Sequence, residues 1–138
     1  MHKWAANVLT RIFQSTRQAN PDTAFLFTSP DFLIPSIRSV LAPLGKWEKV
    51  GHPKHVIFGG LDGDKTACAM IEEGYLDSTG VPDVFEEARL IMTAMLEALE
   101  KCDKTPNAWM FDEGFALPHN NFQTRCSDMW ARKLPSEE

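Results

Sequence analysis

Four aspartates stand in short segments that follow apolar runs of the chain: Asp31, Asp62, Asp64 and Asp83. A carboxylate accepts hydrogen bonds from two neighbouring hydroxyl groups, ligates a hard metal ion, or exchanges a proton with a reacting group. Ser29 precedes Asp31 closely and adds a hydroxyl to the first of these segments. These residue types predict a polar site for a small ligand, and on their own they leave the three chemistries open.

Helix capping is the competing interpretation for two of these aspartates. Asp31 and Asp64 stand just before predicted helices, where an aspartate accepts hydrogen bonds from free backbone N–H groups, so capping is favoured for both. Asp62 directly follows residues 59–61 at a predicted strand end, and capping explains it less well. Asp62 therefore ranks first among the predicted ligand-binding residues, which also include Ser29, Asp31 and Asp83.

Metal and catalytic motifs are weak or missing. Asp62 to Glu73 resembles a calcium loop in its acidic residues, but Ala67 occupies the sixth position, where that loop needs glycine. His52 and His55 lack cysteine or carboxylate partners nearby in the sequence. Nucleophile-elbow, phosphate-loop and dinucleotide-binding glycine motifs are absent. The sequence thus predicts no metal, no cofactor and no enzymatic activity.

Helical and extended patterns alternate along the chain. Apolar runs bounded by turn residues predict strands at 24–28, 55–59 and 76–79. Helices are expected at 4–18, 32–44, 64–73 and 82–101, a strand or edge piece at 109–111, and a last amphipathic helix at 122–134. This alternation predicts an α/β domain with a parallel sheet, whose ligands bind in the loops beyond the carboxyl ends of the strands.

The helix expected at 82–101 carries the strongest periodic signal. Its apolar residues recur at helical spacing: Phe85, Ala88, Met92, Met95, Leu96 and Leu99. A stripe of this kind is typical of a helix face that packs in a core. We therefore expect this face to be buried.

The composition indicates one acidic globular domain. The 138 residues are 43% hydrophobic and 24% charged with a formal net charge of -5, which disfavours nucleic acid or anionic lipid as a partner. No stretch reaches the ~18 apolar residues of a membrane span, and residues 1–11 do not resemble a signal peptide. The cysteines, Cys68, Cys102 and Cys126, are expected to be idle thiols, with a Cys102–Cys126 disulfide as the alternative.

Two stretches carry a resemblance to a known family. Residues 56–64 form an apolar strand and a Gly-x-Asp turn with Asp62, and Gly74 to Thr79 matches Gly-x-Leu-x-(Ala/Ser)-Thr. Upstream, Asn20-Pro21-Asp22 precedes a strand. In these features residues 4 to 105 resemble the C-terminal lobe of type I periplasmic sugar-binding proteins. The chain departs from that family at 29–31, where the family often has Asn-Asp, and at Pro82, where it often has glutamine.

The resemblance implies both a fold and a function. Residues 1–138 would form one domain, a three-layer α/β lobe with flavodoxin-like topology, with the N-terminal lobe absent. Asp62 would bond the hydroxyls of a sugar or small polar solute held between two lobes that close by a hinge motion. The resemblance also implies a periplasmic location and, for the two-lobed protein, a membrane transporter or a sensor kinase as partner.

Other functions compete with this one. The ligand-sensing core of a lactose-repressor-type regulator shares the fold, but residues 124–127 lack its Arg-x-Ser-Thr-like order. A receiver-like signalling domain needs an acidic pair at the end of its first strand, which is missing here. A self-associating interaction module remains open, because an unpaired sheet edge favours a homodimer.

Overall fold

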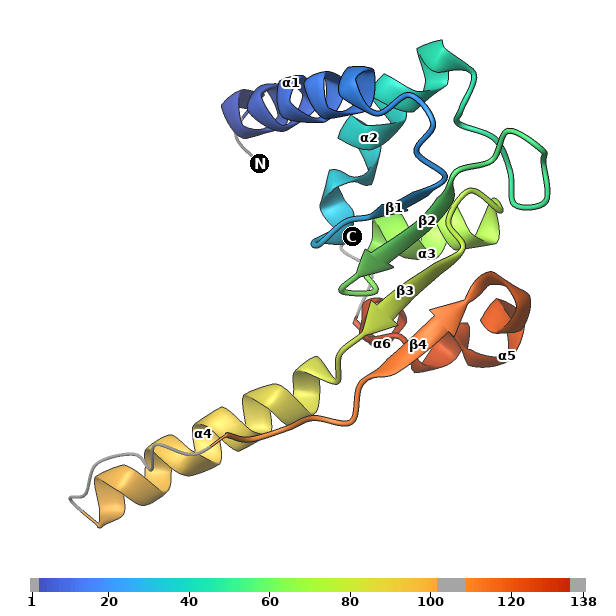
Figure 1. Cartoon of the computed structure of the whole chain (residues 1–138). Helices are drawn as coiled ribbons and strands as arrows, with labels where there is room; N and C mark the ends of the chain where they lie inside the picture. The colour runs from blue at the N-terminus through green and yellow to red at the C-terminus, as the bar shows by residue number, and fades with distance from the viewer. Residues whose placement is uncertain (1–2, 102–108, 135–138) are drawn as a thin grey trace.

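The computed structural model describes residues 3–101 and 109–134, which form a mixed four-stranded sheet with helices (Figure 1). The strands neighbour one another in chain order: β1 (Phe25–Phe27), β2 (Ile57–Leu61), β3 (Ser78–Val81) and β4 (Phe115–Pro118). β1, β2 and β3 are parallel, and β4 is antiparallel to β3. The prediction of an α/β domain with a mostly parallel sheet is confirmed.

The helices that join these strands follow the predicted order. Within the described residues they are α1 (Lys3–Ala19), α2 (Ile34–Leu41), α3 (Lys65–Glu72), α4 (Val84–Glu100), α5 (Phe122–Arg125) and α6 (Trp130–Lys133). Gly45 follows a 3-10 turn at φ 61 and Gly74 follows α3 at φ 84, so glycine supplies the left-handed backbone after both helical segments. The single helix expected at 122–134 is wrong, because a 3-10 turn at Cys126–Asp128 separates α5 from α6.

The strand expected at 109–111 is also wrong, since those residues are not in a strand and β4 begins at Phe115. Trp109 is 89% exposed, so an extended segment there gains no burial among the described residues. β4 instead pairs with β3 and places Leu117 in the core at 0% exposure.

The core lies on one face of the sheet. Phe58 of β2, Val81 of β3 and Leu117 of β4 project into one buried cluster. Residues of α2 and α3 complete it from the helical side, with further residues from the C-terminal helices: Ile34, Ile37, Leu41, Ala67, Cys68, Ile71, Leu76, Phe122 and Met129. Figure 1 shows α3 and α6 behind the strands, α2 between α1 and β1, and α5 beside β4. Ala67 and Ile71 of α3 are both 0% exposed.

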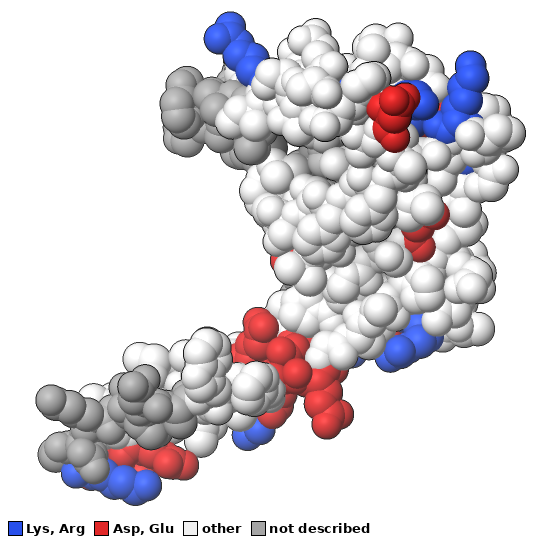
Figure 2. Space-filling model, in the orientation of Figure 1, with Lys and Arg blue, Asp and Glu red and all other residues white. Residues whose placement is uncertain are grey.

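The opposite face of the sheet is open. Phe25 and Phe27 of β1 and Ile57 and Leu61 of β2 are between 40% and 60% exposed, and we call these four residues the open sheet face. No described helix covers them, so the second helical layer of the expected three-layer sandwich is not formed by the described residues. Figure 2 shows the middle of this face almost free of charged side chains.

The apolar stripe of α4 is exposed, which contradicts the expected burial. Phe85, Met92, Met95, Leu96 and Leu99 are 48% to 71% exposed, and Ala88 is exposed as well. α4 projects away from the sheet as an arm, with the segment 109–112 running beside it (Figure 1). Periodicity identified an apolar helix face, but no described element packs over it.

Other expectations concern the cysteines and the membrane. Cys68 is buried, Cys126 is half-buried, and both are free thiols. Cys102 lies outside the described residues, so the Cys102–Cys126 disulfide stays a prediction. Among the helices that the structure describes, none combines the length and hydropathy that crossing a bilayer requires.

One pair of substitutions separates the core from the arm. Ile71→Ala removes a side chain that is 0% exposed and should lower the free energy of unfolding by about 2–5 kcal/mol. Ile91→Ala makes the same chemical change on α4, where the side chain is 54% exposed, and should cost less than about 0.5 kcal/mol. Urea unfolding of both variants measures the difference, and equal losses would show that α4 is packed.

Candidate functional site

The loops after β1 and β2 meet at the carboxyl edge of the parallel strands, beside β3. The Thr28 N–H donates to the Gly59 carbonyl and the Asp62 N–H donates to the Gly80 carbonyl, so the pairing continues past the ends of β1 and β2. The Gly63 N–H then donates across to Oδ2 of Asp31 at 2.8 Å. The loops after β1 and β2 are therefore joined directly, as expected for a site at this edge.

Asp31 lies beneath these loops. It is 0% exposed, and its Oδ2 accepts hydrogen bonds from the Gly63 N–H at 2.8 Å and the Thr79 hydroxyl at 2.7 Å. The side chain does not cap the 3-10 helix that begins at Asp31, so the capping prediction is wrong for this residue. Direct contact between Asp31 and a ligand, predicted from the sequence, would require the loop to open.

The other oxygen of Asp31 explains a glycine. Oδ1 is buried and has no hydrogen-bond partner among the described residues. It lies against Gly60, where an added Cβ would overlap it. Glycine at position 60 is thus required by the close approach of the carboxylate to β2.

The environment of Asp31 changes its acidity. Burial raises the pKa of this carboxyl from 3.8 to about 6, since the charged form loses hydration. The hydrogen bonds from Thr79 and Gly63 act in the opposite direction, and the negative charges of Asp64 and Asp62 raise the pKa further. The charge of Asp31 is consequently sensitive to mildly acidic pH.

Asp62 combines a constrained backbone with a free carboxylate. Its φ is 118, a conformation that L-residues rarely adopt and that is often found at functional sites. Its N–H donates to Gly80, and its carbonyl accepts a hydrogen bond from Nε1 of Trp130 at 2.5 Å. The carboxylate has no hydrogen bond to any residue that the structure describes, and burial and the neighbouring Asp64 raise its pKa.

The remaining predicted residues have different surroundings. Asp64 caps α3 by accepting from the Ala67 N–H at 2.9 Å, which confirms the capping prediction. Asp83 caps α4 through the Glu86 N–H at 3.1 Å, and its own N–H donates to Oδ2 of Asp112 at 2.7 Å. Ser29 is exposed in the loop after β1. Figure 2 shows acidic side chains gathered where α4 leaves the body of the protein.

An open hollow of about 330 Å³ adjoins the strand ends on the open side of the sheet. Its walls include Leu61 and Gly80 from β2 and β3, Pro82 from the loop before α4, and Asp112 from the segment before β4. Two of its wall residues, Leu61 and Pro82, directly precede Asp62 and Asp83 in the sequence. Asp112 is the acidic residue in the wall of this hollow, whereas Asp62 and Asp83 are not among its lining residues.

Sequence reasoning did not single out three residues of this region. Thr79 was recognised only as part of a motif, although its hydroxyl bonds Asp31. Asp112 and Trp130 reach Asp83 and Asp62 from distant parts of the chain, and no local spacing indicates those contacts. Within the described residues, no three His, Cys, Asp or Glu side chains are grouped to hold a metal ion.

The buried carboxyl predicts a pH effect. Because the folded-state pKa of Asp31 is about 6, against 3.8 when unfolded, the native protein holds this proton more tightly. The contribution of Asp31 to stability should decline as pH rises from about 4 to about 6 and then level off. In Asp31→Asn that decline should disappear. Urea unfolding of both proteins at several pH values measures the difference, and identical pH profiles would contradict the assignment.

Comparison with known proteins shows the fold. No protein-family model and no curated protein matches this sequence. The structure is similar to a solute-binding protein of an ABC transporter from Agrobacterium vitis with bound D-fucose (TM-score 0.67, 15% identity, 89% of this chain and 40% of that chain). It is also similar to one from Actinobacillus succinogenes with bound D-allose (0.66, 13%, 86% and 40%) and to one from Mycobacterium smegmatis with bound glycerol (0.65, 19%, 83% and 37%).

These likenesses are of low sequence identity, so they concern the fold. The matched regions cover most of this chain, but the chain spans only about 40% of the length of the proteins that it matches. The mixed, mostly parallel sheet and its helices agree with that fold. This chain therefore has the α/β fold of part of a periplasmic ABC-transporter solute-binding protein.

Proposed function

We propose that the chain is the C-terminal lobe of a two-lobed solute-binding protein and that the loop at Asp62 contacts the hydroxyl groups of a sugar or polyol. One observation carries this proposal: a carboxylate without a hydrogen-bond partner among the described residues stands on a constrained backbone, where the loops after β1 and β2 meet beside β3. Such a group is prepared to accept hydrogen bonds from neighbouring hydroxyls.

The roles that we propose for Asp62 and Asp31 follow from the difference in their burial. Asp62 is partly exposed and would contact the solute, whereas the buried Asp31 would hold Gly63 and thereby the shape of the loop. Asp83 and Ser29 are exposed at the same edge and would add polar contacts. The solutes bound by the similar proteins, D-fucose, D-allose and glycerol, are all rich in hydroxyl groups, which supports this ligand class.

Binding without chemical conversion fits these residues. The similar proteins are solute-binding proteins and not enzymes. By that likeness, we infer a periplasmic location and a transporter or sensor as the protein that reads the closed, ligand-bound form. A second lobe would supply the other half of the pocket, so the chain on its own should bind weakly.

The proposed function predicts that sugars and polyols bind near Asp62. Titration of the ¹⁵N-labelled chain with D-fucose, D-allose or myo-inositol should shift the amide signals of Asp62, Gly63 and Asp83 at millimolar concentrations. Asp62→Asn should weaken the binding about tenfold or more, because a charged acceptor is lost. NMR titration curves of both proteins measure the change.

Asp22→Asn is the matched control for this titration. Asp22 is an exposed aspartate in the turn before β1, at the opposite end of that strand from Ser29, and its replacement should leave the curves unchanged. Unaltered binding in Asp62→Asn would refute the role given to Asp62. Shifts confined to other parts of the chain would refute the location.

Self-association is a second candidate, and the open sheet face favours it. Four exposed apolar side chains on two neighbouring strands form a surface that pairing of two copies would bury. In this case the mass measured by light scattering should rise with concentration, and Phe27→Asp should abolish the rise. Phe85→Asp on α4 is the control. A constant monomer mass at high concentration would exclude this candidate.

A further inference from the structure

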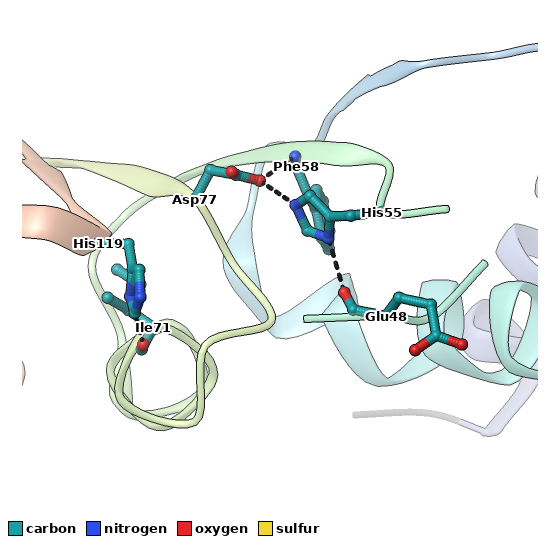
Figure 3. Close-up of polar contacts among 6 residues, drawn as sticks. All are labelled: Glu48, His55, Phe58, Ile71, Asp77 and His119. Carbon is teal, nitrogen blue, oxygen red and sulfur yellow. Dashed lines mark hydrogen bonds and ion pairs between the residues drawn. The ribbon is translucent and has the colours of Figure 1, made fainter. Parts of the chain in front are cut away.

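A second polar cluster lies at the other end of the parallel strands, away from the candidate ligand loops (Figure 3). His55 precedes β2 and Asp77 precedes β3, and Nε2 of His55 lies 2.8 Å from Oδ2 of Asp77. Nδ1 of the same ring lies 2.6 Å from the backbone carbonyl oxygen of Glu48. The His55 side chain is only 8% exposed, so water cannot readily replace either partner.

Both partners of this ring are acceptors. A backbone carbonyl has no proton to give, and an ionised carboxylate has none either. A neutral imidazole carries one N–H, and its other nitrogen would then face an acceptor oxygen with lone pair against lone pair. Only the doubly protonated ring donates at both nitrogens.

We propose that His55 is held as an imidazolium between Asp77 and the Glu48 carbonyl, forming a clasp that fastens residues 46–56 to the sheet. The clasp joins this segment to the start of β3 and so secures the crossover between α2 and β2. The doubly protonated ring donates to both oxygens and is attracted to the Asp77 carboxylate. This inference is independent of the proposed solute binding.

Asp77 is fixed in place to serve this role. Its Oδ2 also accepts the Phe58 N–H at 2.6 Å, and its backbone carbonyl accepts the His119 N–H at 2.7 Å. The carboxylate is therefore oriented by β2 and by the residue after β4 before the ring contacts it. A pre-oriented acceptor lets the ion pair form with little further loss of freedom.

The other charged groups nearby do not compete for the ring. The Glu48 carboxylate is directed to His52, 3.9 Å from its Nδ1, and the Lys49 ammonium lies over the Tyr75 ring, 5.5 Å from its centre. The His119 ring lies near the Ile71 carbonyl at 3.2 Å. Among the described residues, Asp77 is thus the carboxylate that meets His55.

The protonation state of the ring can be observed directly. In ¹H–¹⁵N spectra of the labelled full chain at pH 7, both ring nitrogens of His55 should carry protons, whereas the exposed His52 provides an internal reference. An unprotonated Nε2 in the wild-type protein would overturn the proposal. That result would mean a neutral ring whose Nε2 accepts a hydrogen bond from a protonated Asp77 carboxyl group.

A substitution at the partner sharpens this test. In Asp77→Asn the new side-chain amide can donate to Nε2, so the ring should carry a single proton, on Nδ1, at the same pH. A ring that stayed doubly protonated in Asp77→Asn would show that Asp77 does not determine its state. The wild-type spectra decide the proposal on their own if this variant does not fold.

Amide exchange reports the fastening of the segment. The Val50 N–H donates to the Gly74 carbonyl at 2.9 Å within this segment, and its exchange at pH 7 should be about tenfold faster in His55→Gln. His52→Gln, three residues away, should leave it unchanged. Equal Val50 exchange rates in wild type and His55→Gln would contradict the clasp.

Discussion

A single buried oxygen organises the edge of the sheet where the candidate site lies. Oδ2 of Asp31 receives one hydrogen bond from the loop after β2 and one from the middle of β3, so a residue that follows β1 holds three parts of the chain together. The arrangement requires glycine at position 60 and coincides with the unusual backbone of Asp62. The loop that carries the partly exposed Asp62 is thus held, through Gly63, by a carboxylate that the solvent does not reach.

The second constraint is the one-sided burial of the sheet. All described helices that contribute to the core cover the same face, and the apolar side chains of the other face and of α4 remain in contact with solvent. Apolar surface of this extent is unusual on a protein that works alone. The similar proteins contain more than twice as many residues as this chain.

Local patterns in the sequence were sufficient for the parallel strands and for the helix ends at Gly45 and Gly74, because apolar runs and glycines act over a few residues. They also placed three carboxylate-bearing loops at one edge. They could not show that Asp31 turns inward, since its partner Thr79 lies 48 residues away. Nor could they show what covers α4, because periodicity identifies an apolar face but not its partner. The sequence spacing also does not indicate that His55 lies between two acceptors, because Asp77 lies 22 residues further along the chain.

The attachment of α4 has a mechanical consequence. Two segments run between the sheet and this arm, one leaving β3 and one returning to β4, and the Asp83–Asp112 hydrogen bond ties them together. The backbones are close enough there that a side chain at position 114 would press on the Val81 carbonyl. A helix attached through one segment can rotate about that segment. A helix attached through two segments that are hydrogen-bonded to each other is more restricted in its rotation. The paired attachment therefore restricts rotation of α4 relative to the sheet more than a single connecting segment would.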